Sequence, residues 1–169
     1  MHYRRLYIKG AIYFFTVVTY QRKKIFSQRE NIKFLRKAIN HVKKQHPFKI
    51  LGFVLLADHL HCLWELPEDD DDFSMRWRLI KAYFSRLANN HKKTKTPIWQ
   101  KRFWEHCIRN EKDLTLHLNY IHYNPVKHGY VQSTKNWQYS SFLKYVKLGY
   151  YPLNWAESSG IVRSELEFE

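Results

Sequence analysis

Two apolar, strand-like segments of this chain, residues 48–56 and 59–66, are separated only by Ala57 and Asp58. A connection of two residues suffices for a hairpin, whereas parallel strands need a crossover of a dozen or more residues. We therefore expect the two segments to pair as antiparallel neighbours in one sheet. This hairpin constrains the fold more than any other feature of the sequence.

Strand and helix patterns alternate around the hairpin. Residues 11–19 are β-branched and aromatic, which predicts a strand. Residues 31–45 and 73–90 place apolar side chains at helical spacing, which predicts two helices.

The second half of the chain continues the alternation. Segment 98–109 is strand-like in part, and residues 111–123 predict a helix that Pro125 should end near Asn124. A last helix is expected around residues 140–148. The whole order favours an α+β fold, an antiparallel sheet with helices on one or both faces.

The 169 residues suit one domain, which we expect over residues 1–155, followed by a tail at 156–169. The acidic end of that tail, residues 165–169, is expected either to lie over a basic DNA groove or to remain solvated. The apolar run 11–18 is too short to cross a bilayer, so no membrane partner is expected. Cys62 and Cys107 have no metal-binding spacing, and we interpret both as buried thiols of a cytoplasmic protein.

Charge and aromatic content point to the class of partner. The formal net charge is +14, which favours a polyanion, and membrane surfaces, acidic proteins and nucleic acids all qualify. Aromatic residues make up 17% of the chain, and unpaired bases stack on such rings. Most of these rings are nevertheless expected in the core.

A histidine pair, His59 and His61, lies at the start of the second hairpin strand. Strand side chains alternate between faces, so both imidazoles should point to one side, with β-carbons about 7 Å apart. That separation suits one shared metal ion. The alternative is two histidines that are hydrogen-bonded to backbone or face water.

The helix at 111–123 carries a tyrosine at the margin of its apolar stripe. At 100° per residue, Tyr120 lies on the flank of the stripe, whereas Tyr123 falls nearly opposite the core. Asn124 follows Tyr120 by four residues, so the two side chains are neighbours. Tyr120 suits a nucleophile in a cleft between helix and sheet, although an amphipathic tyrosine at a core margin is the common alternative.

Taken together, these motifs resemble the REP-associated tyrosine transposases, relatives of the single-tyrosine HUH transposases. His59-Leu60-His61 is followed by the run Tyr120-Ile121-His122-Tyr123-Asn124-Pro125-Val126-Lys127-His128-Gly129. Further likeness covers most of residues 3–155. It is carried by Tyr3-Arg4-Arg5, Tyr7-Ile8-Lys9-Gly10, Trp99-Gln100, Arg102-Phe103-Trp104-Glu105-His106 and Ile108-Arg109.

The resemblance implies a ferredoxin-like or RRM-like sheet, the HUH endonuclease fold, and assigns roles by position. His59 and His61 match the metal ligands, Tyr120 the nucleophile and Asn124 a further ligand. The metal would be Mg²⁺ or Mn²⁺; imidazole ligands generally favour zinc and other later transition metals, whereas Mg²⁺ prefers oxygens, and Mn²⁺ relieves this conflict.

Relatives grip palindromic REP hairpins and cut the adjoining single strand through a 5′-phosphotyrosine link. Single-stranded DNA with a hairpin is the expected partner, of a monomer or a dimer. The expected DNA contacts are Arg4, Arg5, Lys92, Lys93, Lys95 and Arg102. No dedicated base for Tyr120 is evident, and His117, one turn earlier, is a candidate. Two other functions stay open: a non-catalytic nucleic-acid-binding module, and a metallonuclease whose histidines activate water.

Overall fold

The expected hairpin forms from β2 (Lys49–Leu55) and β3 (His59–Glu65), which pair antiparallel. β1 (Ile12–Val18) pairs antiparallel with the other side of β3, and β4 (Trp104–Cys107) pairs with β1. The sheet order is therefore β2-β3-β1-β4 in this computed structural model, which describes residues 4–157.

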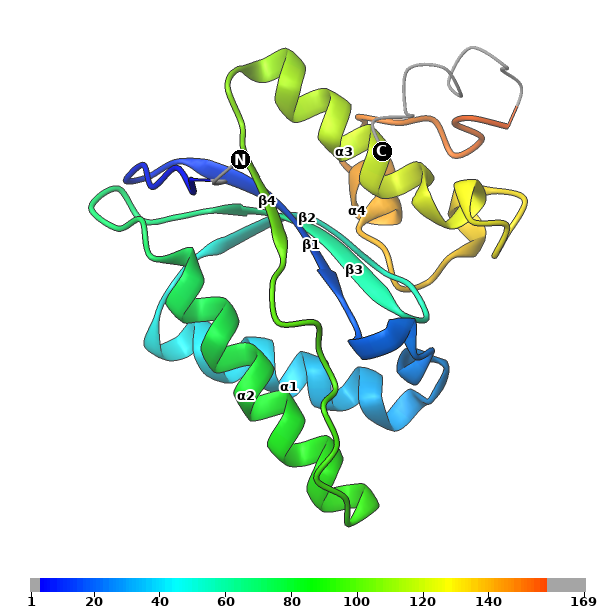
Figure 1. Cartoon of the computed structure of the whole chain (residues 1–169). Coiled ribbons are helices and arrows are strands. Elements are labelled where there is room, and N and C mark those ends of the chain that lie inside the picture. The colour runs from blue at the N-terminus through cyan, green and yellow to red at the C-terminus, as the bar shows by residue number, and fades with distance from the viewer. Residues whose placement is uncertain (1–3, 158–169) are drawn as a thin grey trace.

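Helices cover both faces of the sheet (Figure 1). α1 (Arg29–Gln45) and α2 (Phe73–Lys92) pack on one face, and α3 (Glu111–Lys127) and α4 (Phe142–Lys147) lie on the other. Short 3₁₀ turns occur at Tyr20–Arg22, Ile25–Ser27 and Thr134–Asn136. The chain order β1-α1-β2-β3-α2-β4, with β1 and β3 in the middle, is the ferredoxin-like arrangement, so the α+β prediction is confirmed.

The alternation of strand side chains divides the core in two. Tyr13, Phe15 and Val17 of β1 belong to the larger cluster, which packs against α1 and α2. Phe14 points to the opposite face and belongs to the smaller cluster, which includes Tyr120 of α3. Side chains that share a face with Phe14 therefore lie on the side of the sheet that α3 covers.

The acidic run at 68–72 caps and anchors α2, and the sequence offered Ser74 or an aspartate before the helix as its cap. Asp72 caps α2, since its Oδ1 accepts a hydrogen bond from the Met75 backbone N–H at 2.8 Å. Asp70 binds the guanidinium of Arg76, which is 1% exposed, through both carboxylate oxygens at 3.1 and 2.7 Å. The same guanidinium donates to the carbonyls of His46, Pro47 and Asp72. Arg76 therefore ties the start of α2 to the segment between α1 and β2.

The prediction that Pro125 ends its helix near Asn124 is wrong, because α3 continues to Lys127. A Schellman motif ends it instead: Gly129 has φ +71°, its N–H donates to Val126 O, and the Tyr130 N–H donates to Pro125 O, each at 2.9 Å. Proline cannot donate to the preceding turn, but its fixed φ is compatible with the helix. The additional turn brings Lys127 and His128 toward the sheet.

Three further expectations concern the chain as a whole. Cys62 is buried as predicted, whereas Cys107 is only half-buried, and both are free thiols. Among residues 4–157, no helix is long and apolar enough to span a membrane. Residues 158–169, which hold the acidic end of the predicted tail, lie outside the described residues.

Candidate active site

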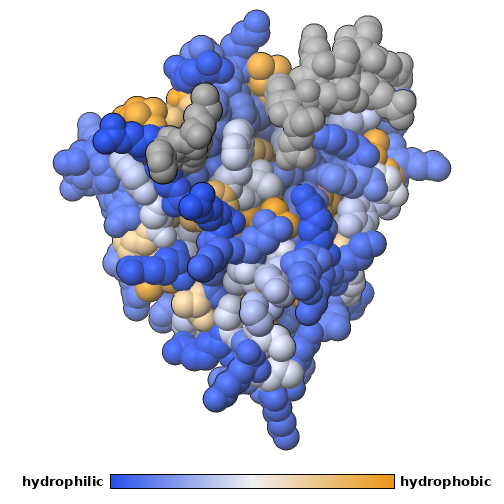
Figure 2. All heavy atoms as spheres, in the orientation of Figure 1, coloured by the Kyte–Doolittle hydropathy of each residue, from blue (hydrophilic) through white to orange (hydrophobic). Residues whose placement is uncertain are grey.

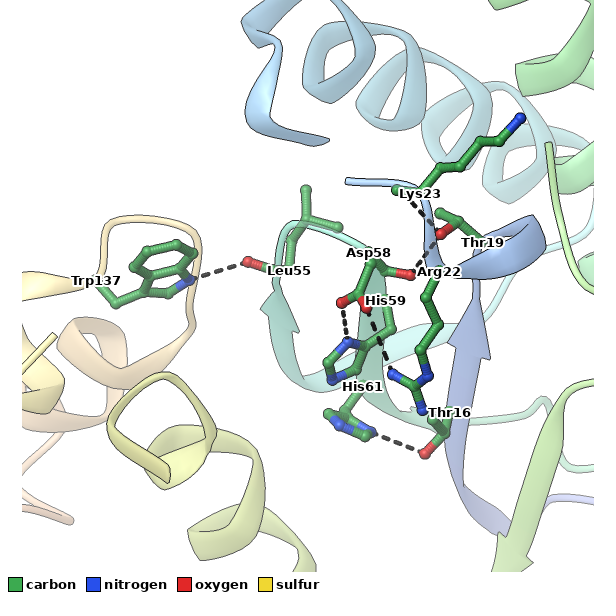
Figure 3. Close-up of polar contacts among 9 residues, drawn as sticks. All are labelled: Thr16, Thr19, Arg22, Lys23, Leu55, Asp58, His59, His61 and Trp137. Carbon is green, nitrogen blue, oxygen red and sulfur yellow. Dashed lines mark hydrogen bonds and ion pairs between the residues drawn. The ribbon is translucent and has the colours of Figure 1, made fainter. Parts of the chain in front are cut away.

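His59 and His61 lie on the face of β3 that is turned toward α3 (Figure 3). Their side chains are on one face, as the strand alternation predicts, and they are only 4% and 1% exposed. The ring centroids are 4.9 Å apart and the rings are nearly perpendicular. Two imidazoles so close together in a buried place are costly unless their nitrogens have partners.

The carboxylate of Asp58 orients His59. Asp58 Oδ1 lies 2.6 Å from His59 Nδ1, and Asp58 Oδ2 lies 3.5 Å from the guanidinium of Arg22 (Figure 3). Burial raises the pKa of Asp58, but the hydrogen bond and charge of His59, together with Arg22, lower that pKa below its usual value. When His59 Nδ1–H donates to this anion, Nε2 carries the free lone pair.

Thr16 orients His61 in a similar way. The Thr16 hydroxyl lies 2.8 Å from His61 Nδ1, across the pair of central strands. His61 Nε2 is buried and has no hydrogen-bond partner among the described residues. Burial, and then the nearby charges of His59 and His128, hold the pKa of His61 well below its usual value, so the ring is neutral. A neutral imidazole with an uncommitted nitrogen is a typical metal ligand.

Tyr120 of α3 packs directly on this pair. Its ring centroid lies 5.1 Å from that of His61, and the side chain is 2% exposed. Lys127 Nζ lies 4.9 Å from the centre of the Tyr120 ring. Tyr120 thus lies between helix and sheet, where a nucleophile was expected.

The placement of Tyr123 opposite the core is wrong, since this residue is only 8% exposed. The reason is a second layer of protein outside α3. The segment that follows α4 packs on the helix, and the rings of Trp155 and Tyr123 lie 6.5 Å apart, edge to face. An amphipathic pattern assumes one covered face, and this helix has two.

Tyr120, Asn124 and His128 follow one another at intervals of four residues and form one stripe of α3 and its C-cap. One end of the stripe, Tyr120, contacts His61, and the other, His128, lies 5.1 Å from His59 between ring centroids. Asn124 lies between these ends, is fully buried, and has no hydrogen-bond partner for either amide atom among residues 4–157. The position of His128 beside His59 was not predicted, because the helix was expected to end before His128.

A second histidine cluster lies on the same face, next to β4. Asp113 Oδ2 is 2.8 Å from His106 Nε2 and accepts from the Arg109 backbone N–H at 2.9 Å. His117 Nδ1 lies 3.1 Å from Asp113 Oδ1. The candidate base His117 is therefore bound to Asp113, and burial lowers its pKa. The spacing of four residues between Asp113 and His117 was the available signal for this cluster.

Three of the expected DNA contacts, the lysines around the end of α2, lie away from the histidine pair. Lys92, Lys93 and Lys95 are exposed around the C-terminal end of α2, on the opposite side of the sheet from α3 (Figure 1), in a region that is hydrophilic in Figure 2. Arg4 and Arg102 are also exposed. Arg5 instead has intramolecular partners, which are Glu105 at 3.4 Å, Ser74 at 2.9 Å and the ring of Phe103 at 4.2 Å.

Known proteins resemble this chain over nearly its whole length. The family described as "Transposase IS200 like" matches residues 7–124. The REP-associated tyrosine transposase of Escherichia coli K12 is 48% identical over 154 residues, which cover 91% of this chain and 90% of that protein.

A protein of Haemophilus influenzae, named as a candidate member of the same group, is 43% identical over 163 residues, covering 91% of this chain and 92% of that protein. A solved structure of a REP-associated tyrosine transposase bound to a REP hairpin is 47% identical and superposes with a TM-score of 0.84, covering 92% of this chain and 91% of that one.

Proposed function

Because the chain belongs to the REP-associated tyrosine transposases, within the IS200-like family, we propose that it cuts and rejoins single-stranded DNA with Tyr120 as nucleophile. The Tyr120 oxygen attacks the scissile phosphorus, the bond to the 3′ oxygen breaks, and a 5′-phosphotyrosine and a free 3′-hydroxyl result. The observation that carries this proposal is the contact of the Tyr120 ring with His61, 5.1 Å between centroids.

The same face offers a fitting set of donors for the divalent metal that the family implies. His61 Nε2 and the Asn124 amide are buried without hydrogen-bond partners among the described residues, and the Asp58 contact leaves His59 Nε2 available. We assign His59, His61 and the Asn124 oxygen as the ligands, with His128 as the competing third ligand. Such an ion, when bound, supplies Lewis-acid polarisation of the scissile phosphate. Two imidazoles favour Mn²⁺ over Mg²⁺.

Activating the Tyr120 hydroxyl and reversing the cleavage step are further parts of the reaction. An ordinary tyrosine has a pKa near 10, so the phenolate needs a stabilising charge. The Lys127 ammonium, 4.9 Å from the Tyr120 ring, supplies one. Because the phosphotyrosine conserves the energy of the broken bond, attack by a 3′-hydroxyl joins strands without another energy source.

The proposed substrate is a DNA hairpin with an unpaired flank, as in the REP hairpin bound by the related structure. Exposed Arg4, Lys92, Lys93, Lys95 and Arg102 are proposed to contact phosphates, and the net charge of +14 supports this. Arg5 is a weaker candidate because its guanidinium is engaged with Glu105. The protein would act in the cytoplasm as a monomer or a dimer.

A strand-cleavage assay tests the proposal. A labelled REP hairpin with an unpaired flank is incubated with Mn²⁺ or Mg²⁺, and the products are separated under denaturing conditions. We expect a covalent protein–DNA adduct from the wild type, none from Tyr120→Phe, and an undiminished adduct from the matched control Tyr123→Phe. Cleavage without an adduct would indicate a hydrolytic metallonuclease, and binding without cleavage under either metal would indicate a non-catalytic module. Both results contradict the proposal.

A further inference from the structure

Three nearly parallel rings stand side by side next to the proposed active site. Trp104 of β4 lies 6.0 Å from His106 with 6° between the ring planes, and His106 lies 4.6 Å from His117 with 13°. The series begins inside the protein, where His117 is 8% exposed, and ends at Trp104, which is 51% exposed. An indole with half of its surface in solvent is the outermost ring.

The inner part of this series is held firmly. Asp113 is 5% exposed; its Oδ2 lies 2.8 Å from His106 Nε2, and its backbone carbonyl accepts a hydrogen bond from His117 Nδ1 at 2.8 Å. Phe14 supports the rings from the strand side, with its centroid 4.8 Å from His117 and 5.7 Å from Trp104. A rigid aromatic surface loses little conformational entropy when another flat ring binds to it.

The strand register aligns this surface with the proposed cutting centre. Thr16 of β1 pairs with His61 on one side and with Trp104 on the other. Trp104 and His61 therefore face the same way, two strands apart, which corresponds to about 10 Å between backbones. Phe14 bridges the gap, since its ring also contacts His61 at 5.5 Å and Tyr120 at 5.9 Å.

We propose that Trp104 is the platform on which an unpaired base, next to the scissile phosphate, stacks. Aromatic side chains hold single-stranded bases in this manner, and each stack strengthens binding irrespective of base identity. The exposed cations Lys101 and Arg102 lie three and two residues before Trp104 and suit the accompanying phosphates. The inference rests on the proposed function, because it takes single-stranded DNA to be the ligand, and it makes Trp104 a positioning residue.

Affinity measurements test the platform without requiring cleavage. The full chain carrying Tyr120→Phe is titrated, by fluorescence anisotropy, into a REP hairpin with an unpaired flank and into the same hairpin without it. Adding Trp104→Ala should weaken binding of the flanked hairpin by about 5- to 160-fold and leave the bare hairpin unchanged, whereas Trp104→Phe should retain most of the affinity. The control Tyr150→Ala removes another exposed ring, 70% exposed and outside the site, and should change neither affinity.

An abasic scan of the flank identifies the stacked base. One abasic position should weaken binding to the Trp104-bearing protein and have no additional effect with Trp104→Ala, which is the signature of a direct pair. The inference is overturned if the flank adds no affinity, if Trp104→Ala weakens both hairpins equally, or if no abasic position depends on Trp104. The failure of the nucleophile assignment is distinguishable, because it would appear as an adduct that survives Tyr120→Phe or as no adduct from the wild type, and either result leaves the Trp104-dependent affinity intact.

Discussion

Replacement of Asp58 with Asn probes how the hairpin turn orients the proposed metal ligand. Asp58 Oδ1 lies 2.6 Å from His59 Nδ1 and the side chain is 14% exposed, so the carboxylate fixes both the ring and its tautomer. An amide of the same shape removes the negative charge and keeps the fold. Loss of such a partner typically weakens metal affinity 10- to 100-fold, and each factor of ten corresponds to about 1.4 kcal/mol.

The assay is a Mn²⁺ titration of adduct formation, together with calorimetric Mn²⁺ binding in the absence of DNA. Asp58→Asn should move both midpoints upward by the same 10- to 100-fold. Arg22→Gln is the matched control, because Arg22 contacts the same carboxylate at 3.5 Å but is 62% exposed. An exposed pair of this kind contributes about 0–1 kcal/mol, so a shift below about fivefold is expected. Unchanged midpoints in Asp58→Asn, or an equal shift in Arg22→Gln, would refute the orienting role.

Two further predictions concern the scaffold. Arg76→Met should lower the free energy of unfolding by about 3–5 kcal/mol, because it leaves Asp70 and three carbonyls without their buried donor. Urea unfolding of this variant and of the exposed control Arg78→Met measures the loss. Equal losses in the two variants would contradict the prediction. Asp113→Asn should lower the free energy of unfolding by about 2 kcal/mol at neutral pH. Burial raises the pKa of Asp113, but its contacts with His106 and Arg109 lower it to about 2. The lowered pKa of Asp113 stabilises the fold above the ordinary carboxyl pKa near 4. The difference in free energy of unfolding between wild type and Asp113→Asn should therefore shrink as pH falls toward 2. A difference that grows on acidification would be inconsistent with this account.

Local sequence patterns were sufficient for much of the fold. The two-residue connection at Ala57-Asp58 fixed the hairpin, and the period of two along β3 placed His59 and His61 on one face. Resemblance to the transposases then indicated the family, which the comparisons confirm. The roles of the two histidines, Tyr120 and Asn124 remain predictions.

Other features depend on contacts between distant segments and could not be predicted from local patterns. Pro125 predicts a helix end, but the Gly129 cap and the packing of α3 determine where the helix stops. The second layer that buries Tyr123 comes from beyond α4, and no periodicity within α3 indicates it. Arg5 looks like a DNA contact by charge alone, whereas its pairing with Glu105 follows from tertiary structure.

Mapping the covalent adduct tests the central claim most directly. The wild-type protein is reacted with a hairpin-flank strand and Mn²⁺, digested with nuclease and trypsin, and sequenced by fragmentation mass spectrometry. The peptide that runs from Asp113 to Lys127 contains both Tyr120 and Tyr123. The account predicts a nucleotide on Tyr120 alone. A modification on Tyr123, on another residue, or on none while strand cleavage proceeds would contradict it.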